Sequence, residues 1–317
     1  MSFTISNNSA AASSNYYLGK NQDLLQTSIK RLASGKKIIR PSDDPGSLSV
    51  AMKLTASISR LTGARNNVQN GTSFLEVQDG VLEGVGRIVT RMSELKGLGS
   101  QDPMKSSQDI ESYNLEFRDL QRQLYDMSQM TFNGVSLFAN YSSPATGTAV
   151  ESEFRKDSTN HTVSIHTSTQ GSQGSKISLH KAALLAALTI NNDANKSAGK
   201  FSEADDSKTD TKFSFAAQES ADVWDLDEVS MGVFQKALEN ISFLRAQVGG
   251  QMSRLSFAAD TLSVQQTNIR AALGRIEDVD IAEESSNLSK YSILTQAAAS
   301  MLTQANSTND VALMLLR

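Results

Sequence analysis

The chain has 317 residues, of which 39% are hydrophobic and 6% aromatic, with a formal net charge of −4 and no cysteine. This balance, without a basic block, gives no electrostatic support for binding nucleic acid or an acidic membrane surface. The absence of cysteine excludes disulfides and thiol chemistry. No apolar run approaches the roughly 18 residues of a membrane span. The first residues also lack the basic and apolar segments of a secretory signal, so we expect no cleaved signal peptide.

The N-terminal part of the chain predicts two helices. Residues 1–14 are small and polar, and we expect them to be disordered in the free chain. A first helix is predicted over 15–34, and Gly35 provides its stop signal. Asp44 followed by Pro45 is typical of an N-cap with proline in the first turn, so a second helix should extend from there to about Leu98.

The middle of the chain predicts a third helix and then a change to strands. The apolar stripe of the second helix shifts by about one residue near Gly71, which predicts a local change of supercoil. Three-four spacing over 110–127 predicts the third helix. Alternation around Val163–Ile165 and Ile177–Leu179 predicts a β-hairpin region over 132–180. Residues 181–219 are expected to form a short variable loop.

The C-terminal part predicts the longest apolar stripe. A helix should begin near 221–226, and steps of four and three from Phe234 to Ile276 meet apolar residues except at Arg245 and Gln266. At about 1.5 Å per residue, this stripe would be roughly 60 Å long and would need long partner helices. A shorter helix over 281–305 and a loose tail should follow.

This order of elements predicts a mainly α fold. Both termini should contribute to a long antiparallel helical bundle or coiled-coil rod, with a small β-hairpin region in the middle of the sequence. We expect the apolar assembly seam to include Leu54, Ile58, Leu61, Phe117, Leu124, Leu238, Ile241, Val248, Leu255, Leu262 and Ile269.

Several short motifs at both ends resemble the signatures of bacterial flagellins. They are Arg31-Leu32-Ala33-Ser34-Gly35-Lys36, Ser42-Asp43-Asp44-Pro45-Gly46, Phe132-Asn133-Gly134-Val135, Arg275-Ile276-Glu277-Asp278 and Gln304-Ala305-Asn306. The resemblance covers about residues 4–180 and 220–317. Pro41 before Ser42 is also the form found in the hook-filament junction protein, a related flagellar hook-associated protein, which is the alternative interpretation.

The resemblance implies a structural subunit that self-assembles into the flagellar filament for swimming motility. Residues 1–40 and 280–317 would form the inner coaxial layer, and 45–131 with 220–275 a helical rod domain that includes the hairpin at 132–180. The short 181–219 segment implies a very small outer domain. The family is secreted through the flagellar channel by type III export, with a chaperone, junction proteins and a cap protein as partners.

The flagellin family is also recognised by a Toll-like receptor of vertebrate innate immunity. The matching positions in this sequence are Arg91, Leu95 and Glu116. The alternative interpretation is that Leu95 belongs to the apolar stripe and that Arg91 and Glu116 lie on a solvated helix face.

An enzyme would need chemistry that the sequence does not supply. His161 and His166 have odd spacing in a predicted strand, which puts them on opposite faces and makes a poor metal pair. Asp43 and Asp44 precede Pro45, so capping is a better interpretation than a catalytic carboxylate pair. We therefore expect no catalytic, metal or cofactor site and no enzymatic activity.

Overall fold

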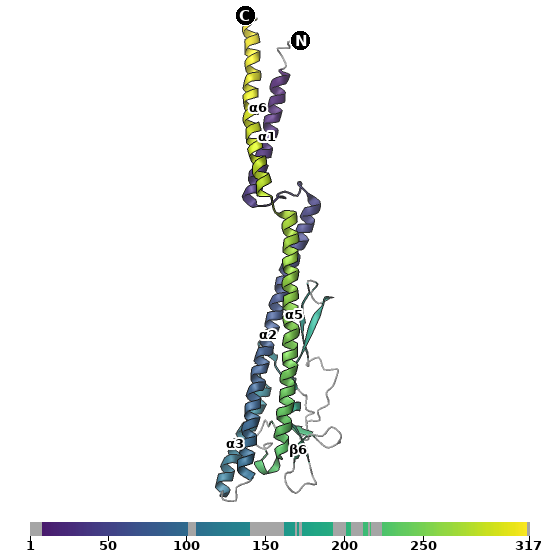
Figure 1. Ribbon diagram of the computed structural model, residues 1–317, viewed down its shortest axis with the longest axis vertical. Coiled ribbons are helices and arrows are strands. Elements are labelled where there is room, and N and C mark those ends of the chain that lie inside the picture. Colours follow the sequence, from purple (N-terminus) through teal and green to yellow (C-terminus); the bar gives the residue numbers. More distant parts are fainter. Residues whose placement is uncertain are drawn as a thin grey trace. The chain divides into compact units, whose positions relative to one another are not determined.

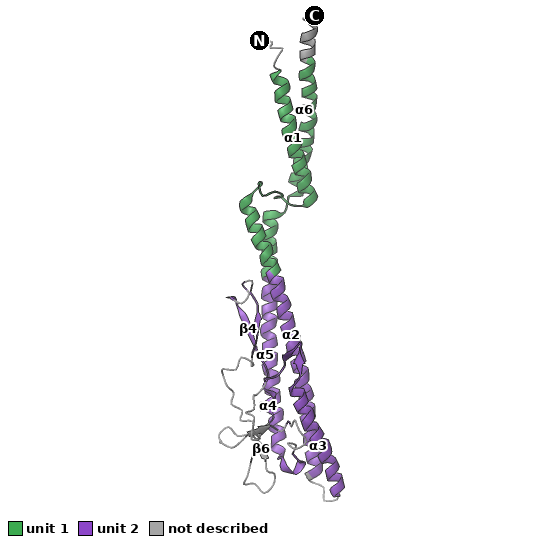
Figure 2. Cartoon of the chain, turned by 180° about the vertical axis from the view of Figure 1, so that it is seen from behind, with its two compact units in different colours: residues 1–59, 265–317 green, residues 60–264 purple. Residues whose placement is uncertain are grey.

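The computed structural model describes residues 8–100, 106–139, 162–168, 170, 173–192, 201–203, 212–214, 216 and 224–315. Its helices are α1 (Ser9–Ser34), α2 (Pro45–Ser100), α3 (Ser107–Ser128), α4 (Leu184–Ala187), α5 (Met231–Glu277) and α6 (Ile281–Leu315), with a 3-10 turn η3 at Leu226–Glu228. Its strands are β1 (Thr131–Phe132), β2 (Val135–Ser136), β3 (Thr162–His166), β4 (Lys176–His180), β5 (Thr189–Asn192), β6 (Phe201–Glu203) and β7 (Lys212–Ser214). The predicted mainly α fold is confirmed (Figure 1). The chain divides into two compact units, unit 1 (residues 1–59 and 265–317) and unit 2 (residues 60–264), shown in Figure 2.

Three helix boundaries differ from the prediction. Helix α1 begins at Ser9 and not at 15, and the side chain of Asn8 accepts a hydrogen bond of 3.0 Å from the Ala11 N–H. The disorder expected for these residues in the free chain stays a prediction. Helix α6 continues to Leu315, beyond the predicted end at 305. Helix α5 begins at Met231 and not at 221–226, because Asp225 and Glu228 close a capping box around η3.

The predicted turn and cap signals act as expected. Gly35 ends α1 in the left-handed conformation at φ 70°. Asp44 accepts the Ser47 N–H at 3.0 Å. The hydrogen bond from the Ser47 side chain, and then this one from its N–H, lower the pKa of the Asp44 carboxyl. The turn between β1 and β2 holds Asn133 and Gly134 at φ 49° and 79°, values that asparagine and glycine tolerate best.

Within unit 2, α2 and α5 pack as an antiparallel pair. A Cβ atom added to Gly86 would lie 3.9 Å from Ile241, and one added to Gly71, earlier on α2, would lie 3.3 Å from Leu255, later on α5. Besides Ala51, Phe74 and Leu95, the buried positions of α2 form a stripe that follows alternate steps of three and four without interruption. They are Leu61, Ala64, Val68, Gly71, Leu75, Gln78, Leu82, Val85, Val89 and Met92.

The predicted register shift near Gly71 is therefore wrong. Gly71 itself occupies one of the buried heptad positions. Because glycine has no side chain, it does not count as part of a hydrophobic stripe in the sequence. A Cβ atom there would lie 2.1 Å from Cδ1 of Ile165. A side chain at this position would require that of Ile165 to move, so glycine lets Ile165 of strand β3 pack directly on α2.

Helix α5 buries a stripe that differs from the predicted one at 238, 245 and 252, while Gln266 of the predicted stripe is buried. The residues at Phe234, Ile241, Val248, Leu255 and Leu262 are buried as predicted. The intervening buried residues are Ala237, Leu244 and Gln251, whereas the predicted Leu238, Arg245 and Met252 are half-buried. The reason is that α5 has partners besides α2: Phe234 meets Phe117 of α3 edge to face at 6.0 Å, and Gln251 bonds the backbone of β4.

Helix α3 is held by buried polar side chains as well as by Phe117 and Leu124. Oδ1 of Asn114 accepts the Leu226 N–H at 3.0 Å. The side-chain amide of Gln121 donates to the carbonyl of Trp224 at 2.7 Å and accepts its N–H at 3.1 Å. These bonds fix the segment that enters α5, because a buried amide must find partners for its polar atoms.

The strands form small antiparallel sheets. Strands β3 and β4 pair over five residues from Thr162–His180 to His166–Lys176, which confirms the predicted hairpin strands. Part of the predicted hairpin turn, at Gly171, lies outside the described residues. In the predicted loop at 181–219, the described residues include α4 and a sheet in the order β6-β5-β7.

The close crossing at Gly71 yields a stability prediction. Gly71→Val should lower the free energy of unfolding by about 1–3 kcal/mol, because Ile165 must move out of its packed position. Gly63→Val in the same helix is the control: a Cβ atom there meets nothing within 4 Å. Urea unfolding of both variants would measure the difference, and an equal effect at the two glycines would contradict the packing described here.

An ion pair between α2 and α5 yields a pH prediction. The guanidinium of Arg245 donates to both carboxylate oxygens of Asp79 at 2.8 and 3.0 Å, and this lowers the pKa of Asp79 below 3.8. A lowered folded-state pKa adds stability above the unfolded-state pKa, and this contribution is lost as the pH falls through the folded value.

Asp79→Asn should therefore reduce the free energy of unfolding at neutral pH by less than about 1 kcal/mol, since the pair is partly exposed. The difference from the unaltered chain should shrink below about pH 4. Glu239→Gln, which removes a pair within α5 alone, is the control. A difference that persists in acid would argue against the ion pair as its cause.

Candidate functional site

The two ends of the chain form a helix pair in unit 1. Helices α1 and α6 pack side by side along their lengths (Figure 1). At the far end of the pair, the side-chain amide of Asn8 donates to the carbonyl of Ala305 at 2.9 Å. The expectation that both terminal parts of the chain contribute helices to one bundle is confirmed for α1 and α6.

This pair fully encloses none of its described apolar side chains, although leucines such as Leu18, Leu25 and Leu288 are half-buried between the two helices. Among the described side chains of 8–34 and 281–307, the buried ones are Ser28 and Glu284, with 2% and 6% exposure, and neither is apolar. Large apolar side chains on the two helices are exposed: Tyr16, Tyr17, Ile29, Ile281, Ile293, Leu294 and Met301. Their exposed fractions range from 39% for Leu294 to 70% for Ile281. Two helices alone cannot enclose these faces, so the pair lacks an apolar core of its own.

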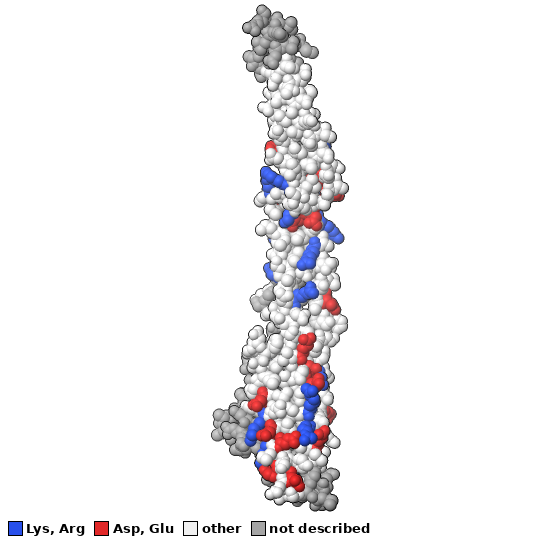
Figure 3. All heavy atoms as spheres, turned by 90° about the vertical axis from the view of Figure 1, so that its left-hand side faces the viewer, with Lys and Arg blue, Asp and Glu red and all other residues white. Residues whose placement is uncertain are grey.

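The same helices carry few charges toward the chain ends. No charged residue precedes Lys20, and none lies between Lys290 and Asp310. On the face seen in Figure 3, the part of the pair nearest the chain ends shows no charged atoms below the grey residues. Exposed apolar faces without charges are typical of surfaces that contact other proteins.

The base of the helix pair is closed by two paired connections. The Lys37 N–H donates to the carbonyl of Glu277 at 2.6 Å, and the Val279 N–H donates to the carbonyl of Gly35 at 3.0 Å. Arg31 of α1 lies 3.8 Å from the buried carboxylate of Glu284. Backbone pairing of this kind links the start of α6 to the end of α1.

Most signature residues have structural roles at these connections. Asp43 accepts the N–H groups of Arg40 and Ile39 at 3.1 and 3.2 Å, and the bond from Arg40 is the main reason that the pKa of Asp43 is lowered. Asp278 pairs with Lys36 as an isolated bridge. Leu32 is half-buried, and Ser34, Arg275, Gln304 and Asn306 are exposed.

The predicted assembly seam lies largely inside the chain. Its members Leu61, Phe117, Leu124, Ile241, Val248, Leu255 and Leu262 all have 3% exposure or less, because unit 2 buries them itself. Leu54, Ile58, Leu238 and Ile269 are half-buried. Surfaces available to other molecules are therefore the exposed faces and not these seven buried residues.

Arg91 and Glu116, from different helices, form an ion pair on the surface of unit 2. Nε of Arg91 lies 2.7 Å from Oε1 of Glu116, and a second carboxylate, Glu94, lies 3.2 Å from Nη1. Hydrogen bonds from Arg91 to Glu116, and then to Glu94, raise the pKa of Arg91. Leu95 has 0% exposure, so its side chain belongs to the core and cannot be touched in the free subunit.

The residues considered for catalysis do not form a site in the described part of the chain. No group of three or more His, Cys, Asp or Glu there could hold a metal ion. His166 and His180 lie at opposite ends of the two-stranded ladder, and His161 lies outside the described residues. Asp43 and Asp44 serve as caps. No described helix combines the length and the hydrophobicity that a membrane span requires.

The site residues predicted from the sequence did not include the exposed apolar residues of α1 and α6. Tyr16, Tyr17, Ile293 and Met301 were not among the predicted site residues, although all four are more than half exposed. The signal that could have found them is the absence of charge at both chain ends, which is unusual for exposed helices.

Two family models and several known proteins match this chain. The model described as bacterial flagellin N-terminal helical region matches residues 5–143, and the bacterial flagellin C-terminal helical region matches residues 231–316. A flagellin of Listeria monocytogenes is 31% identical over 301 residues, which are 95% of this chain and 94% of the relative. The flagellar filament 30.7 kDa core protein of Treponema maltophilum is 28% identical over 313 residues, covering 98% and 99% of the two chains.

A solved structure described as a flagellar hook-associated protein from Vibrio parahaemolyticus has a similar fold. Its TM-score is 0.53 at 14% sequence identity, with 74% of this chain and 100% of that chain covered. At this identity the likeness concerns the fold alone. The two family models together cover most of the sequence, in the same order as the paired helical ends, and the chain belongs to the bacterial flagellin family.

Proposed function

We propose that this chain is a structural subunit of the flagellar filament, which self-assembles by burying the exposed apolar faces of α1 and α6 against other copies. The observation that carries the proposal is the helix pair without a buried apolar side chain in its described part. The described part of unit 2, by contrast, contains an apolar core. Copies of the same chain are suitable partners because each brings the same uncharged faces.

The energetics favour assembly over isolated ordering of the chain ends. An isolated pair of helices gains little from burial, while ordering each residue costs about 1–2 kcal/mol of backbone entropy. Each Ile or Leu that a neighbouring copy covers contributes about 1.5–3 kcal/mol. Several such contacts per copy offset the entropy, so the helix pair should become stable in the polymer.

The expected division of the chain follows from this proposal. Residues 1–40 and 280–317 would form the inner coaxial layer, and 45–131 with 220–275 the surrounding helical domain, with the hairpin region at 132–180 beside it. The contacts divide the chain differently, within α2 at 59/60 and within α5 at 264/265. We also propose type III export through the flagellar channel without a cleaved signal peptide, with a chaperone, junction proteins and a cap protein as partners, and no catalysis.

A second proposal concerns recognition by a Toll-like receptor of the innate immune system. The support is that Arg91 and Glu116, predicted from separate motifs, lie 2.7 Å apart on an exposed surface. Leu95 would act only through the packing of α2, since its side chain is buried. A receptor would then contact Arg91, Glu116 and their exposed neighbours directly.

Assembly is tested by placing a charge on the exposed face of α6. Ile293→Asp should raise the critical concentration for polymerisation by about a hundred-fold, because burial of the isoleucine is lost and a carboxylate must be desolvated. The unfolding midpoint of the free chain should not change, since Ile293 is 67% exposed.

The control is Ser112→Asp on α3, an exposed serine outside the helix pair. Polymerisation would be followed by sedimentation and electron microscopy of filaments. Normal filaments from Ile293→Asp would refute the role of this face. An unaltered chain that stays monomeric while flagellins polymerise would instead favour a hook-associated role.

Receptor recognition is tested by reversing one charge of the exposed pair. Arg91→Asp should reduce receptor signalling by at least about ten-fold, while the free energy of unfolding should fall by no more than about 1 kcal/mol because the pair is exposed. Leu95→Ala should instead lower that free energy by about 2–5 kcal/mol. Arg122→Asp, which removes an exposed ion pair within α3, is the control. Unchanged receptor signalling by Arg91→Asp would contradict the proposed recognition.

A further inference from the structure

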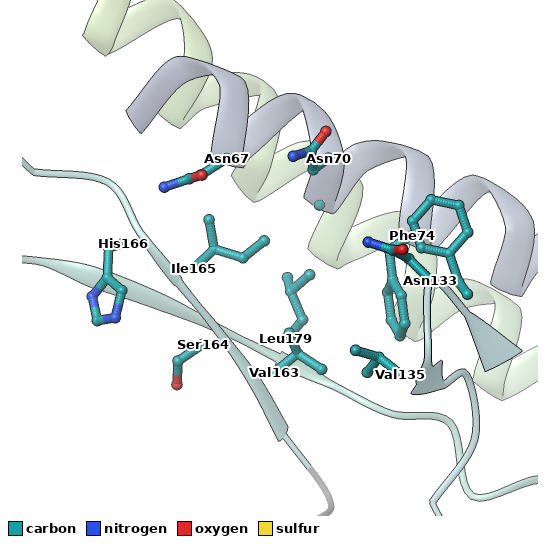
Figure 4. A pocket seen from close by; sticks show the side chains of 12 residues that line it. Asn67, Asn70, Phe74, Asn133, Val135, Val163, Ser164, Ile165, His166 and Leu179 are labelled. Atoms are coloured by element: carbon teal, nitrogen blue, oxygen red, sulfur yellow. The ribbon is translucent and has the colours of Figure 1, made fainter. Parts of the chain in front are cut away.

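An open apolar cavity lies where the β3–β4 hairpin meets α2 in unit 2 (Figure 4). Its volume is about 320 Å³. Phe74 of α2 lies on one side, and Val163 and Ile165 of β3 point toward the helix from the other, whereas Ser164 points away. The lining contains no Lys, Arg, Asp or Glu, so the cavity suits an uncharged side chain.

A row of exposed apolar residues runs along α5 in the same unit. Phe243, Phe257 and Val264 are 71%, 70% and 60% exposed, and Gly250 lies midway between the two phenylalanines. Spacing by seven residues keeps these positions on one side of the helix. We call this row the outer stripe. Single exposed apolar residues are common on proteins, but an aligned row that includes two phenylalanines is typical of a contact surface.

The cavity and Phe257 lie at the same level of unit 2 but on different sides. Leu255 is within contact distance of the cavity wall, because a Cβ atom on Gly71 would be 3.3 Å from Cδ1 of Leu255. Phe257 follows two residues later, a rotation of about 200° around the helix axis. Its side chain therefore leaves α5 on the side away from Leu255, and no chain can place Phe257 in its own cavity.

We propose that Phe257 of one copy inserts into the cavity of a neighbouring copy, with the outer stripe lying against α2 and the β3–β4 hairpin. The inference rests on the proposed assembly into a filament. A projecting side chain and a cavity on different sides of one chain make a heterologous contact, which joins copies in series and does not close at a dimer. Because both features lie at one level, the contact joins copies side by side.

The cavity also depends on Gly71, which links this contact to the fold of the subunit. A Cβ atom at position 71 would lie 2.1 Å from Cδ1 of Ile165. Ile165 points toward the helix and lines the cavity together with Phe74 and Val163 (Figure 4). An aromatic ring gives a large contact area with few rotatable bonds, so it suits this opening.

Cysteine crosslinking tests the contact directly, since the natural chain contains no cysteine. One preparation carries Phe257→Cys and another Asn70→Cys, at the rim of the cavity. The two are mixed with excess unaltered chain, polymerised and oxidised. A disulfide needs its Cα atoms about 4.4–6.8 Å apart, so the mixture should give roughly five-fold more dimer than one with Ser256→Cys in place of Phe257→Cys. Ser256 is exposed and is turned by about 100° from Phe257.

The outcomes separate this inference from the proposed function. Filaments in which only the Phe257→Cys and Asn70→Cys pair crosslinks would support the contact. Filaments that give no such dimer, or that give dimers from Phe257→Cys alone, would overturn the contact while leaving filament formation intact. Failure of the unaltered chain to polymerise would overturn the proposed function and the contact with it.

A substitution series gives a second measurement. Phe257→Ser should raise the critical concentration for polymerisation about ten-fold, which corresponds to about 1.4 kcal/mol. Phe257→Leu should raise it less, because leucine still fills part of the cavity. Ser256→Ala should leave it unchanged. Equal critical concentrations for Phe257→Ser and the unaltered chain would contradict the inference.

Discussion

The antiparallel packing of α2 against α5 in unit 2 is the contact on which the other features of that unit depend. The stripe from Leu61 to Met92 keeps its heptad spacing, and the buried stripe of α5 faces it. Because the two helices are fixed in register, Asp79 meets Arg245 and strand β3 can cross α2 at Gly71. The cavity beside Ile165 and the outward direction of Phe257 are consequences of the same register. The surfaces that unit 2 offers to other copies are thus set by its internal core.

The helix pair of unit 1 is built from similar helices with a different result. Helices α1 and α6 contact each other extensively, but their buried residues in the described part are Ser28 and Glu284. Unit 2 buries its leucines and valines against several elements, whereas two helices by themselves leave an apolar face such as that of Ile293 open to solvent. The difference is therefore in the number of partners and not in the helices. In the proposed assembly the two units differ accordingly: unit 2 has an apolar core within the chain, whereas copies of the chain would cover the exposed faces of α1 and α6.

The sequence predicted those features that depend on local or periodic signals. The helix stop at Gly35, the cap at Asp44, the strands around Ile165 and Leu179, and the buried positions at seven-residue intervals in α5 all agree with the structure. It did not predict the buried polar positions. Asn114, Gln121 and Gln251 bond to backbone groups 112, 103 and 71 residues away, and no periodic pattern encodes such partners. The buried position of Gly71 was not predicted for a related reason. The side chain of Ile165, from β3, packs where a side chain of residue 71 would lie.

The polar composition of the chain ends also suits assembly. The stretch from Tyr291 to Asn309 contains no charge, and Ala, Ser, Thr, Gln and Asn alternate there with a few large apolar residues. Uncharged polar groups can bond to water in the free subunit and to neighbouring helices in a polymer, at a smaller desolvation cost than a charged group would incur. Small residues such as alanine allow helices to approach closely when several copies pack together. A continuous leucine face would bind more strongly, but it would also associate without specificity. A sparse apolar face on a background of uncharged polar residues leaves enough apolar surface for the proposed contacts between copies, without a continuous apolar strip.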